Sequence, residues 1–394
     1  MTVRCTVCDG VALRRSLELG PQPPSNRFLL PGDAGAEERH ALSLGSCDDC
    51  GTVQLVDRMP VEAIRPRFDW LANNEPEGHL DDLVAKLLAL PGIGPDLRVL
   101  GASYKDQSTL ERLGRKGLRH VACVGPQDLP GLPSPFGLEC IQRSLSQPAV
   151  AQALRARYGA IDVLVVRHMV EHAESSARFL DSLRGLLAPG GIMVIEYPDN
   201  DRILRGPYHA FVWEEHFSYF TAGSFAALAG RVGAECVLME RYRYPLEDAL
   251  VAVLRFGPAQ PAGDAARTRA AMPDLEGFAR DFREQQASWR ERLSRLRAAG
   301  EKLAVFGAGH LSVKWINFLG LAEFIDCVID DHPKKAGMRM PGSRLPIVPS
   351  AELDARGIGT CISTLSPESE TRVREKMSAY FIGGGHFLPA FQAA

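Results

Sequence analysis

The stretch LRVLGASYKDQSTLERLGRKG (97–117) joins a short apolar run to an amphipathic segment through a polar turn. LRVLGAS has the composition of a buried strand, whereas STLERLGRKG has apolar residues at helical spacing and ends in glycine. A strand that enters a helix through a tight turn is typical of an α/β unit. Ligands of such units bind at the carboxyl ends of the strands, so the turn ASYKDQ lies where a nucleotide-binding turn is expected.

The same alternation of strand and helix continues on the C-terminal side of this stretch. The predicted strands are HVACVG (120–125), IDVLVVRH (161–168) and GIMVIEYP (191–198), and the predicted helices are 148–159 and 176–191. Strands that alternate with helices predict a parallel sheet with helices on both faces, the doubly wound Rossmann-like α/β architecture. We assign this middle domain to residues 66–257.

A second, smaller α/β unit is predicted after a Pro-, Gly- and Ala-rich linker at 257–274. A charged helix is expected at 275–300, followed by a strand, a glycine turn and a helix start in EKLAVFGAGHLS (301–312). Further strands are expected at 324–331 and 359–365. This pattern predicts a Rossmann-like C-terminal domain over residues 275–394.

The N-terminal module, residues 1–65, is marked by two CxxC pairs about 40 residues apart. The pairs are Cys5 with Cys8 and Cys47 with Cys50. Two CxxC turns bring four thiolates to one Zn²⁺ ion and leave no coordination position open, so we predict a structural zinc site in a zinc-ribbon-like fold. The other five cysteines lie in apolar surroundings and are predicted to be core residues: Cys123, Cys140, Cys236, Cys327 and Cys361.

Composition excludes several classes of function. The 394 residues are 45% hydrophobic and 24% charged, with a net charge of −3, which gives no electrostatic case for nucleic acid or an anionic membrane. The longest apolar runs have strand length, and the start MTVRCTVCDG lacks the apolar region of a signal peptide. We therefore expect a cytoplasmic protein that acts on a small molecule, as a monomer or small homo-oligomer.

The order of these parts resembles the three-domain S-adenosylmethionine-dependent sugar C-methyltransferases, which methylate a carbon beside a ketone in nucleotide-linked deoxysugars. The similarity covers nearly the whole chain. It rests on the paired CxxC turns and on four further stretches: IDVLVVRHMVEH (161–172), LLAPGGIMVIEYP (186–198), WEEHFSYF (213–220) and VIDDHPKKAGMRMPGSRLPIVP (328–349). The last contains the DxxPxKxGxxxPG run that is a hallmark of the family's C-terminal domain.

The resemblance implies catalytic roles for His216, Glu215, Tyr219 and His172, with Ser218 also near the sugar. A base is needed to remove a proton beside a ketone, and histidine is suited to that task near neutral pH. Glu215 would orient the imidazole and Tyr219 would donate to the enolate oxygen. The alternative is that EEHFSYF is only a packed loop. The family's Tyr-His pair is replaced by Trp213 and Glu214, which removes one hydroxyl contact.

The resemblance also implies a site for S-adenosylmethionine, for which this sequence is divergent. The candidate cofactor-binding residues are Gly101, Ser103, Tyr104, Asp106 and His168. Gly101 stands where the family has an acid, and Ser103 and Gln107 stand where it has glycines. Gly125 replaces the acid that holds the ribose, and Asp128 follows three residues later.

Two segments close to this turn have two interpretations each. Lys105 would disfavour a sulfonium and favour a phosphate, unless Tyr104 and Lys105 face solvent. In NNEPEGHLDD (73–82), a group of polar residues forms either an altered substrate pocket or an ordinary helix N-terminus: Asn73, Asn74, Glu75, Glu77 and His79. Glu75 and His79 would share one helical face if the helix begins after Pro76.

The C-terminal turn GAGHLS (307–312) is followed about 20 residues later by Asp330 and Asp331. This spacing fits a dinucleotide fingerprint, but the third glycine is missing, so a structural turn is the favoured interpretation.

The sequence thus predicts a C-methyltransferase that uses His216 as base, S-adenosylmethionine as donor and a keto substrate. One alternative is an enzyme that enolises or epimerises a phosphorylated or nucleotide-linked keto compound without methyl transfer. The other is a non-catalytic partner of another enzyme.

Overall fold

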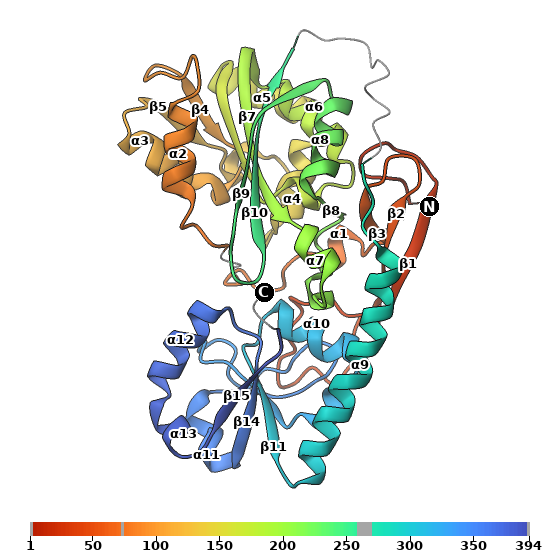
Figure 1. Ribbon diagram of the computed structural model, residues 1–394. Coiled ribbons are helices and arrows are strands. Elements are labelled where there is room, and N and C mark those ends of the chain that lie inside the picture. The colour runs from red at the N-terminus through yellow and green to blue at the C-terminus, as the bar shows by residue number, and fades with distance from the viewer. Residues whose placement is uncertain (1–2, 72–74, 258–269, 392–394) are drawn as a thin grey trace.

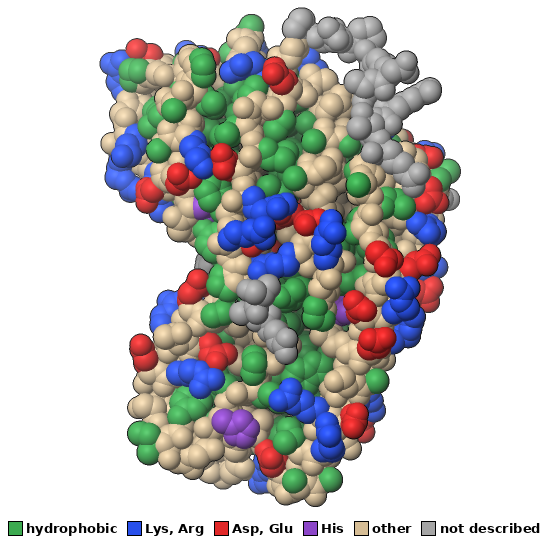
Figure 2. All heavy atoms as spheres, in the orientation of Figure 1, with side chains coloured by type: hydrophobic (Ala, Val, Ile, Leu, Met, Phe, Trp, Pro, Cys, Tyr) green, Lys and Arg blue, Asp and Glu red, His purple; other side chains and the backbone are tan. Residues whose placement is uncertain are grey.

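The computed structural model describes residues 3–71, 75–257 and 270–391. It has three β-sheets, which follow one another along the chain (Figure 1). Among the described residues, no helix is both long and apolar enough to cross a membrane. The space-filling surface is indented between the middle and C-terminal domains (Figure 2).

The N-terminal sheet is antiparallel, with strand order β1-β2-β3-β8. Its strands are β1 (Leu13–Gln22), β2 (His40–Cys47), β3 (Val53–Asp57) and β8 (Ser218–Tyr219). The strand β8 comes from the middle domain, so the fourth strand of this sheet lies directly after the EEHF segment. A short helix α1 (Val61–Ile64) follows β3.

The middle sheet has the order β5-β4-β6-β7-β10-β9. Its strands are β4 (Arg98–Gly101), β5 (His120–Cys123), β6 (Ile161–Arg167), β7 (Leu187–Asp199), β9 (Ala234–Tyr242) and β10 (Asp248–Phe256). β5, β4, β6 and β7 are parallel, whereas β10 is antiparallel to both β7 and β9. The predicted strands thus form a parallel sheet, and the hairpin of β9 and β10, which was not predicted, adds an antiparallel edge to it.

Helices cover both faces of the middle sheet. They are α2 (Leu80–Leu88), α3 (Gln107–Arg115), α4 (Leu138–Leu145), α5 (Pro148–Tyr158), α6 (Ser176–Arg184) and α8 (Ala222–Arg231). The short helix α7 (Asp201–Arg205) instead contributes Ile203 and Leu204 to the core that includes α9 and the N-terminal sheet. One apolar cluster includes α2 and α3, and the other includes α4, α5, α6 and α8. The helix expected at 176–191 ends at Arg184, because the PGG segment already belongs to β7.

The C-terminal sheet has the order β13-β12-β11-β14-β15 and is parallel throughout. Its strands are β11 (Lys302–Phe306), β12 (Cys327–Ile329), β13 (Ile347–Val348), β14 (Ile358–Ser363) and β15 (His386–Pro389). The helices of this domain are α9 (Leu275–Ala298), α10 (His310–Leu319), α11 (Leu353–Arg356), α12 (Pro367–Lys376) and α13 (Ser378–Ile382). Most of the linker expected at 257–274 lies outside the described residues.

One apolar core joins the first and last parts of the chain. Leu17 and Leu44 of the N-terminal sheet belong to the same buried cluster as Phe278 of α9 and Trp315 of α10. In Figure 1, α9 runs along the C-terminal domain towards β1. The N-terminal module is therefore held by an extensive core shared with the C-terminal domain, in addition to its metal site.

Candidate functional site

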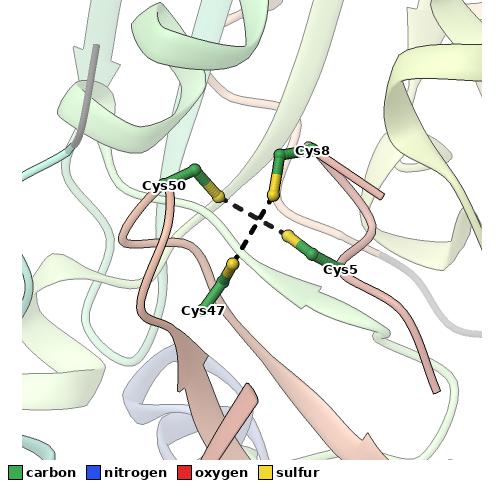
Figure 3. A group of neighbouring side chains, drawn as sticks. All are labelled: Cys5, Cys8, Cys47 and Cys50. Atoms are coloured by element: carbon green, nitrogen blue, oxygen red, sulfur yellow. Dashed lines mark hydrogen bonds between the residues drawn. The ribbon is translucent and has the colours of Figure 1, made fainter. Parts of the chain in front are cut away.

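The four predicted zinc ligands come together at one end of the N-terminal sheet (Figure 3). The sulfurs of Cys5 and Cys50 are 3.5 Å apart, as are those of Cys8 and Cys47. A tetrahedral site with Zn–S bonds of about 2.3 Å has sulfurs about 3.8 Å apart, so this arrangement fits a Zn²⁺ ion. The predicted zinc site is confirmed.

The zinc turn also supports the EEHF segment. Thr6 lies between the first two cysteines, and its carbonyl accepts a hydrogen bond of 2.8 Å from the backbone N–H of Ser176. The Ser218 hydroxyl donates to the Thr6 hydroxyl at 2.8 Å. Ser218 was expected near the sugar, but its side chain is fully buried against the zinc turn. It therefore positions the segment that follows His216.

A compact cluster of acids and histidines lies after β6 and around the EEHF segment. The 3-10 turn at Val170–His172 supplies Glu171 and His172, and the loop before β8 supplies Glu215 and His216. Glu139 joins them from the first turn of α4. Ligand atoms of Glu139, His172 and Glu215 all lie within 4.8 Å of one another, as do those of Glu171, His172 and His216. The structure therefore brings together three of the four predicted catalytic residues.

The His216 ring is enclosed by aromatic groups. Its centroid is 4.9 Å from that of His172 and 4.8 Å from that of Trp213. No hydrogen bond from a described residue reaches its ring nitrogens, although the residue is only 7% exposed. Burial, together with the charges of His172 and His168, keeps the pKa of His216 well below its usual value.

Glu215 is buried and has one polar neighbour in the N-terminal module. The Asn26 amide donates to its carboxylate at 3.0 Å. Burial, and then the charges of Glu139 and Glu214, raise the pKa of Glu215 well above its usual value. This carboxyl group therefore lies beside Glu139 rather than against the His216 ring nitrogens.

The Tyr219 hydroxyl, expected to be an enolate donor, is bonded to the backbone of its own loop. The hydroxyl accepts a hydrogen bond of 2.8 Å from the backbone N–H of Trp213 and donates at 3.1 Å to the carbonyl of the same residue. Both capacities of the hydroxyl are used inside the loop, and the side chain is 1% exposed. Tyr219 therefore fixes the loop that carries Glu215 and His216.

The two substituted positions before Glu215 connect the loop to the C-terminal domain. Trp213 stacks on His310 at the start of α10, with ring centroids 4.4 Å apart. The Glu214 carboxylate forms a fully buried ion pair with Lys314 of α10 and accepts a hydrogen bond of 2.7 Å from the Ser25 hydroxyl. Burial lowers the pKa of His310 to about 4, so that its ring is neutral in this contact.

The turn after β4 is held mainly by its own side chains. The Asp106 carboxylate accepts hydrogen bonds of 2.8 Å from the backbone N–H groups of Ser103 and Arg167. Ser103 caps the turn by accepting from the N–H of Lys105. A Cβ on Gly101 would meet Leu110 and Asp106 rather than open space. Gly101, Ser103 and Asp106 are thus buried in the turn and do not form an open cradle.

The ends of β4, β6 and β7 are bridged by a charged network that the sequence did not predict. Lys105 Nζ lies 2.6 Å from the Glu75 carboxylate. The Arg167 guanidinium contacts Glu196 at 2.6 Å, Glu77 at 3.1 Å and the Lys105 carbonyl at 2.7 Å. Both interpretations of Lys105 were wrong, because the ammonium is paired inside the protein and faces neither an open anion site nor bulk solvent.

His168, which follows β6, and His79, which precedes α2, both contact Glu196. His168 Nε2 lies 3.1 Å from Glu196, and His79 Nε2 lies 3.3 Å from it. The helix α2 begins at Leu80, so Glu75 precedes it and shares no helical face with His79. Asn73 and Asn74 lie outside the described residues. Since His168 is buried in this network, it supports the strand end rather than presenting an open ring to a cofactor.

The carboxylate of Asp128, the acid that follows β5, is also bonded within the protein. The Asp128 carboxylate accepts from the Gly125 N–H and the Tyr158 hydroxyl, each at 2.8 Å, and pairs with Arg157 at 2.6 Å. The polar groups expected to hold S-adenosylmethionine are therefore occupied, whereas Tyr104, 55% exposed, and Gln107 are accessible side chains of the turn. Pairing of Lys105 with Glu75 removes the repulsion expected for a sulfonium.

In the C-terminal domain the glycine turn is braced from within. Asp330 accepts a hydrogen bond of 3.0 Å from the Ala308 N–H, and Lys335 bridges the Asp330 carboxylate and the Ala308 carbonyl at 2.9 and 2.7 Å. The Asp and Lys of the DxxPxK run thus stabilise the GAGHLS turn, in agreement with the structural interpretation.

Comparisons with known proteins place each part of the chain. Residues 5–64 match the family described as "Putative zinc binding domain", residues 79–238 match a methyltransferase domain, and residues 264–391 match a C-methyltransferase C-terminal domain. The C-methyltransferase NovU of Streptomyces niveus is 24% identical over 366 residues, which cover 87% of this chain and 84% of the relative.

Two solved structures are similar to part of the chain. A 1,6-didemethyltoxoflavin-N1-methyltransferase of Burkholderia thailandensis is 18% identical, covers 46% of this chain and 80% of its own, and has a TM-score of 0.31. The CurJ carbon methyltransferase is 14% identical, covers 45% of this chain and 53% of its own, and also has a TM-score of 0.31. The chain thus carries, in this order, regions that match a zinc-binding domain, a methyltransferase domain and a C-methyltransferase C-terminal domain.

Proposed function

We propose that this enzyme methylates a carbon adjacent to a ketone, in a nucleotide-linked sugar or a similar keto compound, with His216 as the base. The observation that carries the proposal is the His216 imidazole, which is enclosed by Trp213 and His172 and accepts no hydrogen bond from any described residue. A buried imidazole with a free ring nitrogen is available to a substrate C–H.

The chemistry begins with removal of a proton from the carbon beside the ketone. His216 takes this proton on a ring nitrogen, and the electron pair of the C–H bond moves towards the carbonyl oxygen to give an enolate. Trp213 and His172 limit the access of water to the imidazole. S-Adenosylmethionine, when bound, supplies the methyl group, and we propose that Tyr104, an exposed side chain of the turn after β4, contacts it.

Similarity supports the type of reaction. NovU is a C-methyltransferase by name, and the match extends over all three parts of this chain. The keto sugar follows from the family resemblance of the WEEHFSYF and DxxPxK stretches, which lie in the loop at the site and in the domain that contacts it.

A second candidate function is enolisation or epimerisation without methyl transfer. The occupied side chains of the β4 turn favour it, because Ser103 and Asp106 bond within the protein and Asp128 already holds three partners. Such an enzyme would use the same base and the same enolate, and would return the proton to carbon.

The test compares the wild type with His216→Asn on a panel of nucleotide-linked keto sugars in D₂O, with and without S-adenosylmethionine. NMR follows deuterium incorporation beside the ketone and the appearance of a new methyl signal. We expect His216→Asn to slow both by about 10²-fold or more, since a positioned general base contributes 10²–10⁴-fold. His40→Asn, at the first residue of β2 and paired with Glu38, is the matched control.

The outcomes separate the candidates. Methylation that depends on His216 supports the proposal. Deuterium exchange that depends on His216, with no methyl product and no binding of S-adenosylmethionine by calorimetry, supports the second candidate. Exchange at the wild-type rate in His216→Asn would falsify the assignment of the base.

A further inference from the structure

The strongest feature that the proposed reaction does not use is the contact between Glu139 and His172. Glu139 Oε1 and His172 Nδ1 are 2.9 Å apart. Both atoms are buried, and neither has a hydrogen-bond partner within the described residues, so the short contact lacks the alignment of a hydrogen bond. The contact is an ion pair in which neither atom has an aligned hydrogen bond, so both atoms are able to bind a common third partner.

A third ligand atom lies at the same point. A Glu215 carboxylate oxygen is within 4.8 Å of both atoms. Each of the three residues is at least nine-tenths buried, with exposed fractions of 2% for Glu139, 2% for His172 and 8% for Glu215. The three side chains come from the start of α4, the turn after β6 and the loop before β8. They are therefore held by separate elements of the domain.

Local packing directs Glu139 inward. The residue two positions before it is Gly137, and a Cβ there would lie 2.4 Å from Glu139 Oε2. Any larger residue at 137 would displace the carboxylate. Because Gly137 has no side chain, the Glu139 carboxylate has room to lie beside it.

The acids of the cluster are paired with histidines, Glu139 with His172 at 2.9 Å and Glu171 with His168 at 3.7 Å. Neither Glu139 nor Glu171 forms an ion pair with a lysine or arginine of the described residues, and both oxygens of Glu171 lack a hydrogen-bond partner there. Glu171 is 1% exposed and adjoins His172. A divalent cation would compensate several of these buried carboxylates together.

We propose that Glu139, His172 and Glu215 bind one divalent metal ion of the first transition series, separate from the four-cysteine zinc site. Two carboxylates and one imidazole are ligands that suit Mn²⁺, Fe²⁺, Co²⁺ or Zn²⁺, and three protein ligands leave coordination positions open. The site lies beside His216, whose ring is 4.9 Å from that of His172.

The role of this ion rests on the proposed function, whereas the site itself does not. An enolate needs a positive partner, and the Tyr219 hydroxyl that was expected to stabilise it is bound to the Trp213 backbone. When His216 takes the proton from carbon, the C–H electron pair forms the C=C bond and the carbonyl π pair becomes the lone pair of the enolate oxygen. The cation would hold that oxygen.

Mn²⁺ is the probe, because this ion prefers oxygen and nitrogen ligands and does not compete for a thiolate site. The full-length, zinc-loaded protein is titrated with Mn²⁺ in the absence of substrate, and the free ion is measured by electron paramagnetic resonance. We expect the wild type to bind one Mn²⁺ per chain. Glu139→Gln and Glu215→Gln should weaken binding at least tenfold. Glu62→Gln, at an exposed ion pair with Arg143, should bind as the wild type does.

Zinc content and circular dichroism establish that each variant is folded. A wild type that leaves Mn²⁺ free at millimolar concentration would overturn the site, as would equal binding by wild type and both folded glutamine variants. Deuterium exchange beside the ketone then tests the role. Exchange that Mn²⁺ accelerates in the wild type and not in Glu139→Gln supports it. A bound Mn²⁺ that leaves His216-dependent exchange unchanged overturns the enolate role without affecting the proposed function.

Discussion

At the scale of single residues, Tyr219 occupies a position that resembles a catalytic one, and its side chain stabilises the loop around it. Its hydroxyl both accepts from and donates to the backbone of Trp213. The five residues between the two positions include Glu215 and His216. The geometry of the proposed base therefore depends on a phenol that is bonded to the loop itself.

The variant Tyr219→Phe should lower the free energy of unfolding by about 1–3 kcal/mol, because it leaves a buried backbone N–H without its acceptor. Turnover should fall less than in His216→Asn. Urea denaturation followed by circular dichroism measures the change in stability, with Tyr242→Phe as a control at a more exposed tyrosine that donates to Asp82. A Tyr219→Phe protein with unchanged stability and strongly reduced kcat would show that the hydroxyl acts in the reaction itself.

The sequence identified His172, Glu215 and His216, because these residues stand in stretches that resemble the family. It did not identify Glu139, which lies 33 positions before His172 in a segment without a motif. An acid in the first turn of a helix is ordinarily explained by the helix dipole. Only the packing of α4 against the turn after β6 shows that this carboxylate reaches the histidine.

At the scale of elements, the end of β6 is stabilised by charge. His168 has a positive φ of 52° and lies between Glu196 on β7 and Glu171 in the following turn. Burial by itself would lower the pKa of His168, but the bonds to Glu171 and Glu196 outweigh it and raise the pKa to about 10. The protonated imidazole thus helps to hold two adjacent strand ends together.

This shift predicts a dependence of stability on pH. The folded-state pKa lies above the unfolded value of about 6.5, so the contribution is complete below that pH and is lost as pH rises through about 10. His168→Asn, which tolerates the positive φ, should show a smaller loss of stability between pH 6.5 and 10 than the wild type. Urea midpoints measured across this range test the prediction. Parallel pH profiles for the two proteins would contradict it.

The alternating pattern from residue 97 onward predicted the strands β4, β5, β6 and β7 and the helices between them, because each has its own apolar period. The hairpin of β9 and β10 was not predicted. β10 is a nearly continuous buried run, DALVAVLRF, and such a run does not indicate whether the strand is parallel or antiparallel to its neighbours. Pairing with β7 in the antiparallel sense is a tertiary property, set by the short connection between β9 and β10.

At the scale of the whole molecule, the zinc site and the reaction site are mechanically connected. Thr6, inside the first CxxC turn, bonds to Ser176 and Ser218, and β8 completes the N-terminal sheet. The N-terminal sheet shares its core with α9 and α10. Loss of the metal should therefore affect more than the first 65 residues.

The variant Cys47→Ser should release zinc and lower the stability of the full chain, since three thiolates bind the ion much less tightly than four. The loop that carries His216 should lose support as well, so catalytic activity should fall with the zinc content. Calorimetry and metal analysis of the same samples test this, with Cys236→Ser as the control at a cysteine outside the metal site. Unchanged zinc stoichiometry in Cys47→Ser would contradict the assignment of the ligand.

The loop at 213–217 touches Ser25 and Asn26 from the first part of the chain and His310 and Lys314 from the last. Chimeras built by exchanging one domain between homologues would leave Glu214 facing a foreign helix. Recombination that retains activity should therefore transfer these neighbours together with the loop. A middle domain engineered by itself would lack the residues of the other two domains that contact the loop.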